Sequence, residues 1–248
     1  MRLQLCTWPE VERYLERSRG IIVPIGSTEQ HGPNGLIGTD AICPEVIANG
    51  VAERLDVLVA PTLAIGMAQH HMAFPGSMTL RPSTLIAVLR DIVESLTTHG
   101  FELCYFLNGH GGNVPSVRAA FSEINADAAL GAGKRAARCT LCNWYMTPRV
   151  RGISKDLFGA AEGMHATPSE ISLTWHAHPD AVREMDMEPK IAPRGPILDA
   201  EDYRRRFPDG RIGSDPSLSS REAGERLYHA AVEDVVDDYQ RELASARD

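Results

Sequence analysis

Runs of apolar residues alternate with longer amphipathic segments along most of the chain. The apolar runs are nearly continuous, and each is bounded by turn-forming residues, a pattern that is typical of buried parallel strands. We therefore predict four strands, each buried on both faces. The four runs are residues 20–26, 56–66, 101–109 and 137–144.

The segments that follow these runs have the periodicity and the end signals of helices. Thr39 or Asp40 is the expected N-cap of the first helix, and Asn113 is the expected N-cap of the third. The second helix opens with a Pro-Ser pair and ends at Gly100. The predicted helices are residues 40–55, 82–100, 113–130, 168–176 and 220 to about 244.

Strands that alternate with helices over short links form right-handed crossovers and a mainly parallel sheet covered on both faces. We predict an α/β fold with one domain, residues 1–248, because a chain of this length can bury one large core. After Trp144 the pattern loosens. Residues 189–217 are rich in proline and glycine and too long for a plain connection, so we expect them to cover a site or to contact another subunit.

The composition is ordinary for a globular protein, with 43% hydrophobic and 23% charged residues. The net charge of −8 and the lack of a basic block argue against a surface for nucleic acid or for an anionic membrane. No apolar run approaches the ~18 residues of a membrane span, and the start of the chain lacks the apolar run of a signal peptide. The five scattered cysteines suit a reducing compartment, so we expect a cytoplasmic protein.

Clusters of polar side chains follow three of the predicted strands, where ligands bind in an open α/β sheet. Carboxylates and imidazoles together bind divalent ions such as zinc, manganese or iron. The carboxylates outnumber what one zinc ion usually takes, so we predict two ions ~3.5–4 Å apart that share a carboxylate. The residues concerned are Glu29, His31 and Asp40 after the first strand, His70 and His71 after the second, and His110 after the third.

The segment NGHGGN around His110 leaves a second interpretation open. Its glycines allow a close backbone approach to a ligand, and a helix start beyond it favours anions, as in a non-catalytic phosphate- or nucleotide-binding module. It lacks the GxGxxG order and the Lys-Ser/Thr ending of a P-loop. A metal-dependent phosphatase is a third interpretation, but basic residues to hold the phosphate are scarce near these loops, the nearest being Arg81 and Arg118.

Four motifs resemble those of the creatininase (creatinine amidohydrolase) family in order and in approximate spacing. They are GSTEQHGPNGLIGTD, FPGSMTL, NGHGGN and HATPSEIS, and they span most of residues 22–172. The first and third motifs are specific to the family. The resemblance implies a three-layer α/β/α sandwich, usually two divalent metal ions per subunit, hydrolysis of non-peptide and often cyclic amide bonds, and a hexamer.

The resemblance also assigns metal ligands residue by residue. It implies that Glu29 and His110 bind one ion and that His31 binds the other. Asp40 takes the position of the carboxylate that bridges both ions.

The chain departs from the pattern of creatininase at two positions. Creatininase has a further ligand, a glutamate, where this chain has Gly112, and in relatives with the NGHGGN form a later glutamate, here Glu170, is able to replace it. The resemblance makes His165 a catalytic residue that contacts the substrate and passes a proton to the leaving nitrogen. The preceding residue, acidic in creatininase, is Met164, and we predict Glu162 as a compensating general base or hydrogen-bond partner.

Two further residues are expected to contact the substrate. Adjacent side chains of an extended chain face opposite ways, so at most one of His70 and His71 is expected to reach the pocket. The family tends to have a histidine at the second of these positions, which favours His71. Ser77 of the FPGS motif is the other expected contact.

These assignments predict a metal-dependent hydrolase that cleaves a C–N amide bond of a small molecule with a metal-activated water. Because of the departures at Gly112 and Met164, we expect a substrate other than creatinine. The alternatives within the same chemistry are a deformylase of a formamidopyrimidine-type substrate and a creatininase-like peptidase.

Overall fold

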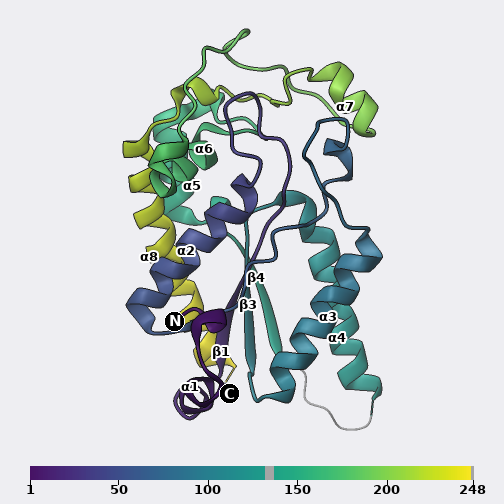
Figure 1. Cartoon of the computed structure of the whole chain (residues 1–248), viewed down its shortest axis with the longest axis vertical. Helices are drawn as coiled ribbons and strands as arrows, with labels where there is room; N and C mark the ends of the chain where they lie inside the picture. The colour runs from purple at the N-terminus through teal and green to yellow at the C-terminus, as the bar shows by residue number, and fades with distance from the viewer. Residues whose placement is uncertain (132–136, 247–248) are drawn as a thin grey trace.

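The centre of the molecule is a parallel sheet of four strands in the order β2-β1-β3-β4 (Figure 1). The computed structural model describes residues 1–131 and 137–246. Each apolar run that we assigned to a strand contains one, although only two residues of the second run pair regularly. The strands are β1 (Gly20–Ile25), β2 (Leu58–Val59), β3 (Leu103–Asn108) and β4 (Arg138–Asn143).

The two central strands and the outer strand β4 differ in burial. β1 and β3 are buried along their whole length, as predicted. β4 is only partly buried because it lies at an edge of the sheet, so the expectation of burial on both faces was wrong for this strand. Ile25, Asn108 and Asn143 align at the carboxyl ends of three strands, which places the loops that follow them at one edge.

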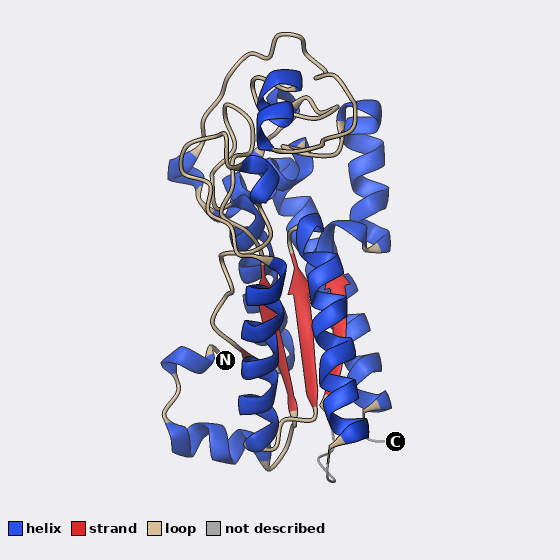
Figure 2. Ribbon diagram, turned by 90° about the vertical axis from the view of Figure 1, so that its right-hand side faces the viewer, coloured by secondary structure: helices blue, strands red, loops and turns tan. Residues whose placement is uncertain are grey.

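Helices cover both faces of the sheet, which confirms the three-layer α/β/α sandwich (Figures 1 and 2). One layer contains α2 and α8, with α5 and α6 packed against α8 toward the upper end in Figure 1. The other layer contains α3 and α4, which pack against each other. The bounds are α2 (Thr39–Leu55), α3 (Pro82–Thr98), α4 (Val114–Leu130), α5 (Pro148–Phe158), α6 (Pro168–Ala177) and α8 (Arg221–Ser245).

The starts of two helices differ from the prediction. Thr39 and Asp40 lie inside α2 and do not cap it. Asn113 does not cap α4 with its side chain, because its amide is used elsewhere. It donates a hydrogen bond to the Gly26 carbonyl oxygen and accepts one from the Met67 N–H, both at 2.9 Å. Asn113 therefore ties the loops after β1, β2 and β3 together.

The sequence pattern missed two helices beyond β4, α5 and α7 (Ala200–Arg206). α5 has apolar residues at helical spacing, Val150, Ile153 and Phe158, which pack in the core, but Gly152 and the charged residues between them obscure this pattern in the sequence. α7 is short and lies within the proline- and glycine-rich segment that we expected to be irregular.

Residues 189–217 are held in place by a buried arginine. The side chain of Arg211 is fully buried and forms an ion pair with Asp209 at 2.8 Å. Its guanidinium also donates hydrogen bonds to the carbonyl oxygens of Pro189, Lys190 and Ser214. This network fixes a long segment that has few regular elements of its own.

The remaining elements are short. No helix among the described residues is both long and apolar enough to cross a membrane. The short elements are α1 (Trp8–Leu15) and the 3-10 turns Leu3–Leu5, Gln69–His71, Gly111–Asn113, Trp144–Met146, Gly159–Ala161, Pro179–Ala181 and Pro216–Leu218.

Candidate metal centre

The predicted metal ligands meet at the carboxyl ends of β1 and β3, where α2 begins. Gly26 and Gly109, just beyond these strands, lie against the first turn of α2. A Cβ on Gly26 would lie 2.1 Å from the Asp40 carbonyl oxygen, and a Cβ on Gly109 would lie 2.0 Å from it. Only glycine permits this approach, which brings Asp40 to the edge of the sheet.

Asp40 lies between two sets of side chains and turns one carboxylate oxygen toward each. Its Oδ2 lies 2.9 Å from His110 Nδ1, and Glu29 Oε2 lies 3.3 Å from His110 Nε2. Its Oδ1 lies 3.0 Å from His31 Nε2, and Glu170 Oε2 lies 4.0 Å from the same nitrogen. Within each set, one ligand atom per residue lies within 4.8 Å of the others. The structure thus brings together the five residues that the family resemblance implies as metal ligands, namely Glu29, His31, Asp40, His110 and Glu170.

The chemistry of this donor set fits a pair of divalent metal ions. Glu29 Oε1 and Asp40 Oδ2 are buried and accept no hydrogen bond from the described residues, although imidazole nitrogens lie 2.9 Å from both. A buried carboxylate oxygen without a hydrogen bond is costly unless a cation pairs with it. Carboxylate oxygens and imidazole nitrogens are suitable ligands for zinc, manganese or iron.

In the absence of metal ions, protons balance the carboxylates of this cluster. Burial alone lowers the pKa of each imidazole, but the neighbouring carboxylates outweigh it and raise the pKa of His31 to about 10 and that of His110 to about 9. Burial raises the pKa of Glu29 to about 7, whereas His31 and His110 hold the pKa of Asp40 below its usual value despite burial. A metal ion that binds here must displace the imidazole protons.

The start of α6 positions Glu170. Its Oε1 accepts a hydrogen bond from the Thr167 N–H at 2.6 Å, and the Thr167 hydroxyl accepts one from the Glu170 N–H at 3.3 Å. This capping box leaves Oε2 to face His31.

At Gly112, by contrast, a Cβ would lie 2.3 Å from His110 Nε2. A glutamate there is incompatible with the present place of His110, which gives a physical reason for a carboxylate from α6.

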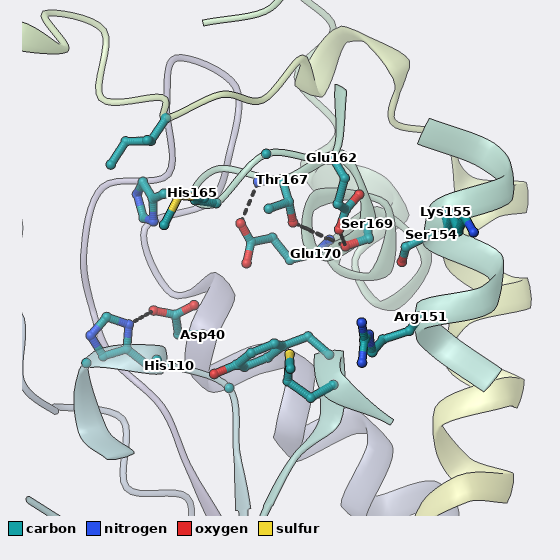
Figure 3. Close-up of a pocket in the computed structure, with 18 of the residues that line it drawn as sticks. Asp40, His110, Arg151, Ser154, Lys155, Glu162, His165, Thr167, Ser169 and Glu170 are labelled. Atoms are coloured by element: carbon teal, nitrogen blue, oxygen red, sulfur yellow. Dashed lines mark hydrogen bonds and ion pairs between the residues drawn. The ribbon is translucent and has the colours of Figure 1, made fainter. Parts of the chain in front are cut away.

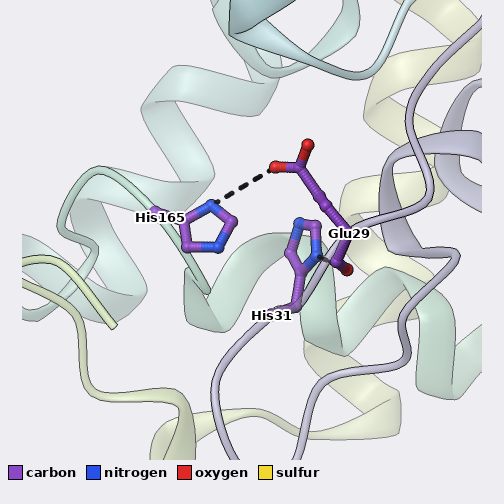
Figure 4. A group of neighbouring side chains, drawn as sticks. All are labelled: Glu29, His31 and His165. Atoms are coloured by element: carbon purple, nitrogen blue, oxygen red, sulfur yellow. Dashed lines mark hydrogen bonds and ion pairs between the residues drawn. The ribbon is translucent and has the colours of Figure 1, made fainter. Parts of the chain in front are cut away.

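Two further histidines lie beside the cluster and contact Gln30. His165 Nε2 lies 2.7 Å from the Gln30 carbonyl oxygen and 3.0 Å from the Gln30 amide nitrogen; because a carbonyl oxygen only accepts, we assign the proton to Nε2. His165 Nδ1 then faces Glu29 Oε1 at 3.9 Å, and these two residues form a third possible ligand group with His31 (Figure 4). His71 Nδ1 lies 3.1 Å from the Gln30 amide nitrogen, and its Nε2 lies 2.9 Å from Glu29 Oε1. Burial lowers the pKa of both imidazoles, so they are neutral.

The loop after β2 differs from the expectation in two ways. His70 and His71 both line the pocket, because residues Gln69–His71 form a 3-10 turn and not an extended chain. Ser77 is not among the residues that line the pocket. Its hydroxyl accepts a hydrogen bond from the Gln30 N–H at 3.2 Å, so here Ser77 supports the loop that carries the ligands.

Glu162 lies in the pocket wall, as the sequence analysis expected of a catalytic residue. One of its carboxylate oxygens accepts a hydrogen bond from the Ser169 hydroxyl (Figure 3), and the other is buried without a partner among the described residues. Burial raises the pKa of Glu162 to about 7. Met164, which also lines the pocket, is 74% exposed and offers no acid.

One cavity of about 920 Å³ is lined by Asp40, His110, His165 and Glu170, whereas Glu29 and His31 are not among its lining residues (Figure 3). Residues 189–217 contribute Ile197, Tyr203 and Ile212 to its lining, so this segment borders the pocket, which is one of the two roles we expected. These lining residues and Arg151 of α5 were not predicted from the sequence. The apolar spacing of Val150, Ile153 and Phe158 could have revealed α5 as a helix but not that Arg151 lines a cavity, and α7 is too short to show a periodicity.

The chain is similar to known proteins over nearly its whole length. The family model Creatininase, described as creatinine amidohydrolase, matches residues 4–238. Creatinine amidohydrolase of Pseudomonas putida is 27% identical over 96% of this chain and 95% of its own length. Mycofactocin precursor peptide peptidase of Mycobacterium ulcerans is 28% identical over 93% of this chain and 84% of its own.

Solved structures show the same fold. The structure described as "Creatininase Mn" has a TM-score of 0.85 and 24% identity, with 98% of both chains covered. A second, described as a Zn-Zn type of creatininase with one substitution, has a TM-score of 0.83, 24% identity and the same coverage. Since the family model spans nearly the whole chain, this protein belongs to the creatininase family of amidohydrolases.

Proposed function

We propose that this protein is a metal-dependent amidohydrolase that cleaves a non-peptide C–N bond of a small molecule at a centre of two divalent ions. The observation that carries the proposal is the position of Asp40, which presents one oxygen to each of two ligand sets. Glu29 and His110 would hold one ion with Asp40, and His31 and Glu170 would hold the other. Zinc, manganese and iron all suit these ligands, and the related solved structures are described as Mn and Zn-Zn forms.

Divalent ions in such a centre polarise the substrate carbonyl and lower the pKa of a water molecule enough to make it a nucleophile at neutral pH. The nitrogen of an amide is a poor leaving group unless it is protonated, so the chain must also supply a proton. Glu162 lines the pocket, and its pKa of about 7 leaves it partly protonated at neutral pH. We therefore assign the transfer of a proton to the leaving nitrogen to Glu162.

His165 has a complementary role in this proposal. Its Nε2–H is engaged by the Gln30 carbonyl oxygen, so only Nδ1 is available on the side of the cluster. A neutral imidazole with a free Nδ1 accepts a hydrogen bond or a proton and does not donate one. We assign to His165 the orientation of the substrate, and the sequence-based role of proton donor passes to Glu162.

The volume of the cavity limits the size of the amide substrate. A volume of about 920 Å³ accommodates a small molecule or the end of a short peptide. A deformylase and a peptidase use the same centre, and a peptidase is among the curated relatives. The hexamer and the cytoplasmic location remain predictions from the family resemblance and the composition.

The proposal is tested by elemental analysis of the purified protein, followed by removal of the metal with a chelator and its restoration. The restored protein is assayed against cyclic amides, formamides and short peptides. We expect about two divalent ions per subunit and hydrolysis of at least one class, lost on chelation and recovered with the metal. Full metal content without hydrolysis of any class would contradict the proposed function.

A further inference from the structure

One wall of the cavity is formed by a polar face of α5. Arg151, Ser154 and Lys155 all line the cavity, and their spacing of three and four residues places them on one side of the helix. Figure 3 shows Arg151 and Ser154 projecting from α5 toward the cavity. This wall lies across the cavity from Asp40 and His110 (Figure 3).

The two cations of this face have no counterion among residues 1–131 and 137–246. Among the described residues, no carboxylate lies within 4.0 Å of Arg151 or Lys155 in an ion pair. The hydroxyl of Ser154 likewise makes no hydrogen bond to a described residue, although this side chain is only 8% exposed. The face therefore offers two positive charges and a hydroxyl to whatever enters the cavity.

Arg149, on the same helix, differs from these cations because it forms ion pairs within the protein. Its guanidinium lies 2.6 Å from Asp234 and 2.9 Å from Asp237 of α8. Arg149 is not among the residues that line the cavity. The contrast shows that α5 pairs its outward arginine with acidic residues of α8 and leaves its cavity-facing cations available.

The metal centre does not need these cations. Two divalent ions would carry four positive charges against the three carboxylates of Glu29, Asp40 and Glu170, so no negative charge is left over for α5 to balance. The positive face of α5 is thus complementary to an anionic group on the bound molecule. An arginine fork and an ammonium group are the usual partners of carboxylate and phosphate oxygens.

We propose that α5 is a specificity wall that selects substrates bearing an oxyanion at the end remote from the scissile amide. The inference rests on the proposed function, since it takes the metal centre as the place of the amide. Arg151 and Lys155 bind the oxyanion, and Ser154 donates a further hydrogen bond. The shared chemistry is that of a carboxylate or a phosphate, and the experiment below separates the two.

The test measures dissociation constants of the zinc-loaded full chain by titration calorimetry. The carboxylate probes are succinamate, glutaramate and adipamate, each paired with its neutral diamide, and the phosphate-like probe is 3-phosphonopropanamide, paired with succinamide. We expect at least one anionic probe to bind about tenfold more tightly than its neutral partner. The preferred chain length reports the span from the metal centre to α5, and the preferred anion identifies the group.

Variants assign this preference to the wall. R151M/K155M should reduce the preference to less than twofold, and R151K should retain part of it because the charge remains without the fork. The matched control is R118M, which removes an exposed arginine of α4 that does not line the cavity and should keep the full preference.

Two results would overturn the inference. One is equal binding of every anionic probe and its neutral partner. The other is a preference that survives in R151M/K155M, which would assign the anion to the metal ions. Ammonia release, measured in parallel, reports hydrolysis of the amides independently. Loss of the proposed function would appear there, while the binding preference would still be measurable.

Discussion

The cavity has two walls of opposite kinds. The wall over β1 and β3 presents Asp40 and His110, which contact the fully buried Glu29 and His31. The wall on α5 presents Arg151 and other polar groups that are open to the cavity and unpaired within the described protein.

The difference separates two tasks. Buried ligands in mutual contact tolerate little change, because each one fixes the charge and position of the next. Exposed side chains on a helix face can change without disturbing the core. In the proposed function, the first wall sets the reaction, whereas the second wall is free to adapt to the substrate.

Among substitutions that leave the metal ions bound, we expect the largest effect on turnover from a substitution of Glu162, which belongs to neither wall. Glu162→Gln keeps the shape of the side chain but removes the proton that the leaving nitrogen needs. We expect kcat on the hydrolysed amide to fall by about 10²–10⁴-fold with unchanged metal content. Steady-state kinetics and elemental analysis check this result. Glu201→Gln, at an exposed position on α7, is the matched control, and a fall of less than threefold in Glu162→Gln would remove Glu162 from the chemistry.

A second prediction concerns protons at the metal wall. Because the pKa of His31 is about 10 and that of His110 is about 9 without metal, both imidazoles must release a proton when metal binds. The affinity for each ion should therefore rise with pH by about tenfold per unit below pH 9, and the overall constant for both ions by up to about a hundredfold. Calorimetry in buffers of different ionisation enthalpy should report about two protons released per subunit. Affinity that is independent of pH between 6 and 8 would contradict the assignment of these histidines as ligands.

A third prediction concerns the close packing around His110 at the metal wall. Gly112→Ala adds a Cβ that would lie 2.3 Å from His110 Nε2, so the imidazole must move. We expect metal affinity to fall by about 10–100-fold, measured by competition with a chelator. Gly111→Ala is a closely matched control, because the nearest atom to its Cβ would be the Tyr145 hydroxyl at an ordinary 3.5 Å. Equal losses in the two variants would show that the loop, and not the contact with His110, is the cause.

The smallest effect is on stability. The pKa of Glu162 is about 7 in the folded protein against an ordinary value of 4.5, so the folded state holds this proton to higher pH than the unfolded state does. The contribution of Glu162 to the free energy of unfolding therefore falls as pH rises from about 4.5 to about 7. In the metal-free protein, Glu162→Gln should gain about 2–3 kcal/mol relative to wild type across this range. Urea unfolding at pH 5 and pH 7.5 measures the gain, and parallel stability curves would contradict the burial of this carboxyl.

The sequence predicted the metal wall better than the α5 wall for a physical reason. The ligands of the metal wall have few acceptable replacements, and glycines at Gly26 and Gly109 are required by the close approach to Asp40. Such requirements leave recognisable motifs. The α5 wall needs only positive charge on one side of a helix, and this pattern resembles an ordinary solvated surface.

Other differences arise where local conformation overrides a simple rule. His70 and His71 both reach the cavity because a 3-10 turn replaces the extended chain that we assumed. Asn113 appeared suited to cap α4, but tertiary hydrogen bonds between loops take its amide. The strands were easier to predict, since β1 and β3 are buried on both faces and their apolar runs are unbroken.

Elemental analysis of three purified variants tests whether Asp40 holds both metal ions and α5 holds none. The variants are Asp40→Ala, R151M/K155M and Asp127→Ala, the last being a surface control on α4, with folding checked by circular dichroism. We predict about two divalent ions per subunit in R151M/K155M and Asp127→Ala, and loss of both ions in folded Asp40→Ala. Full metal content in folded Asp40→Ala, or loss of metal in R151M/K155M, would contradict the account.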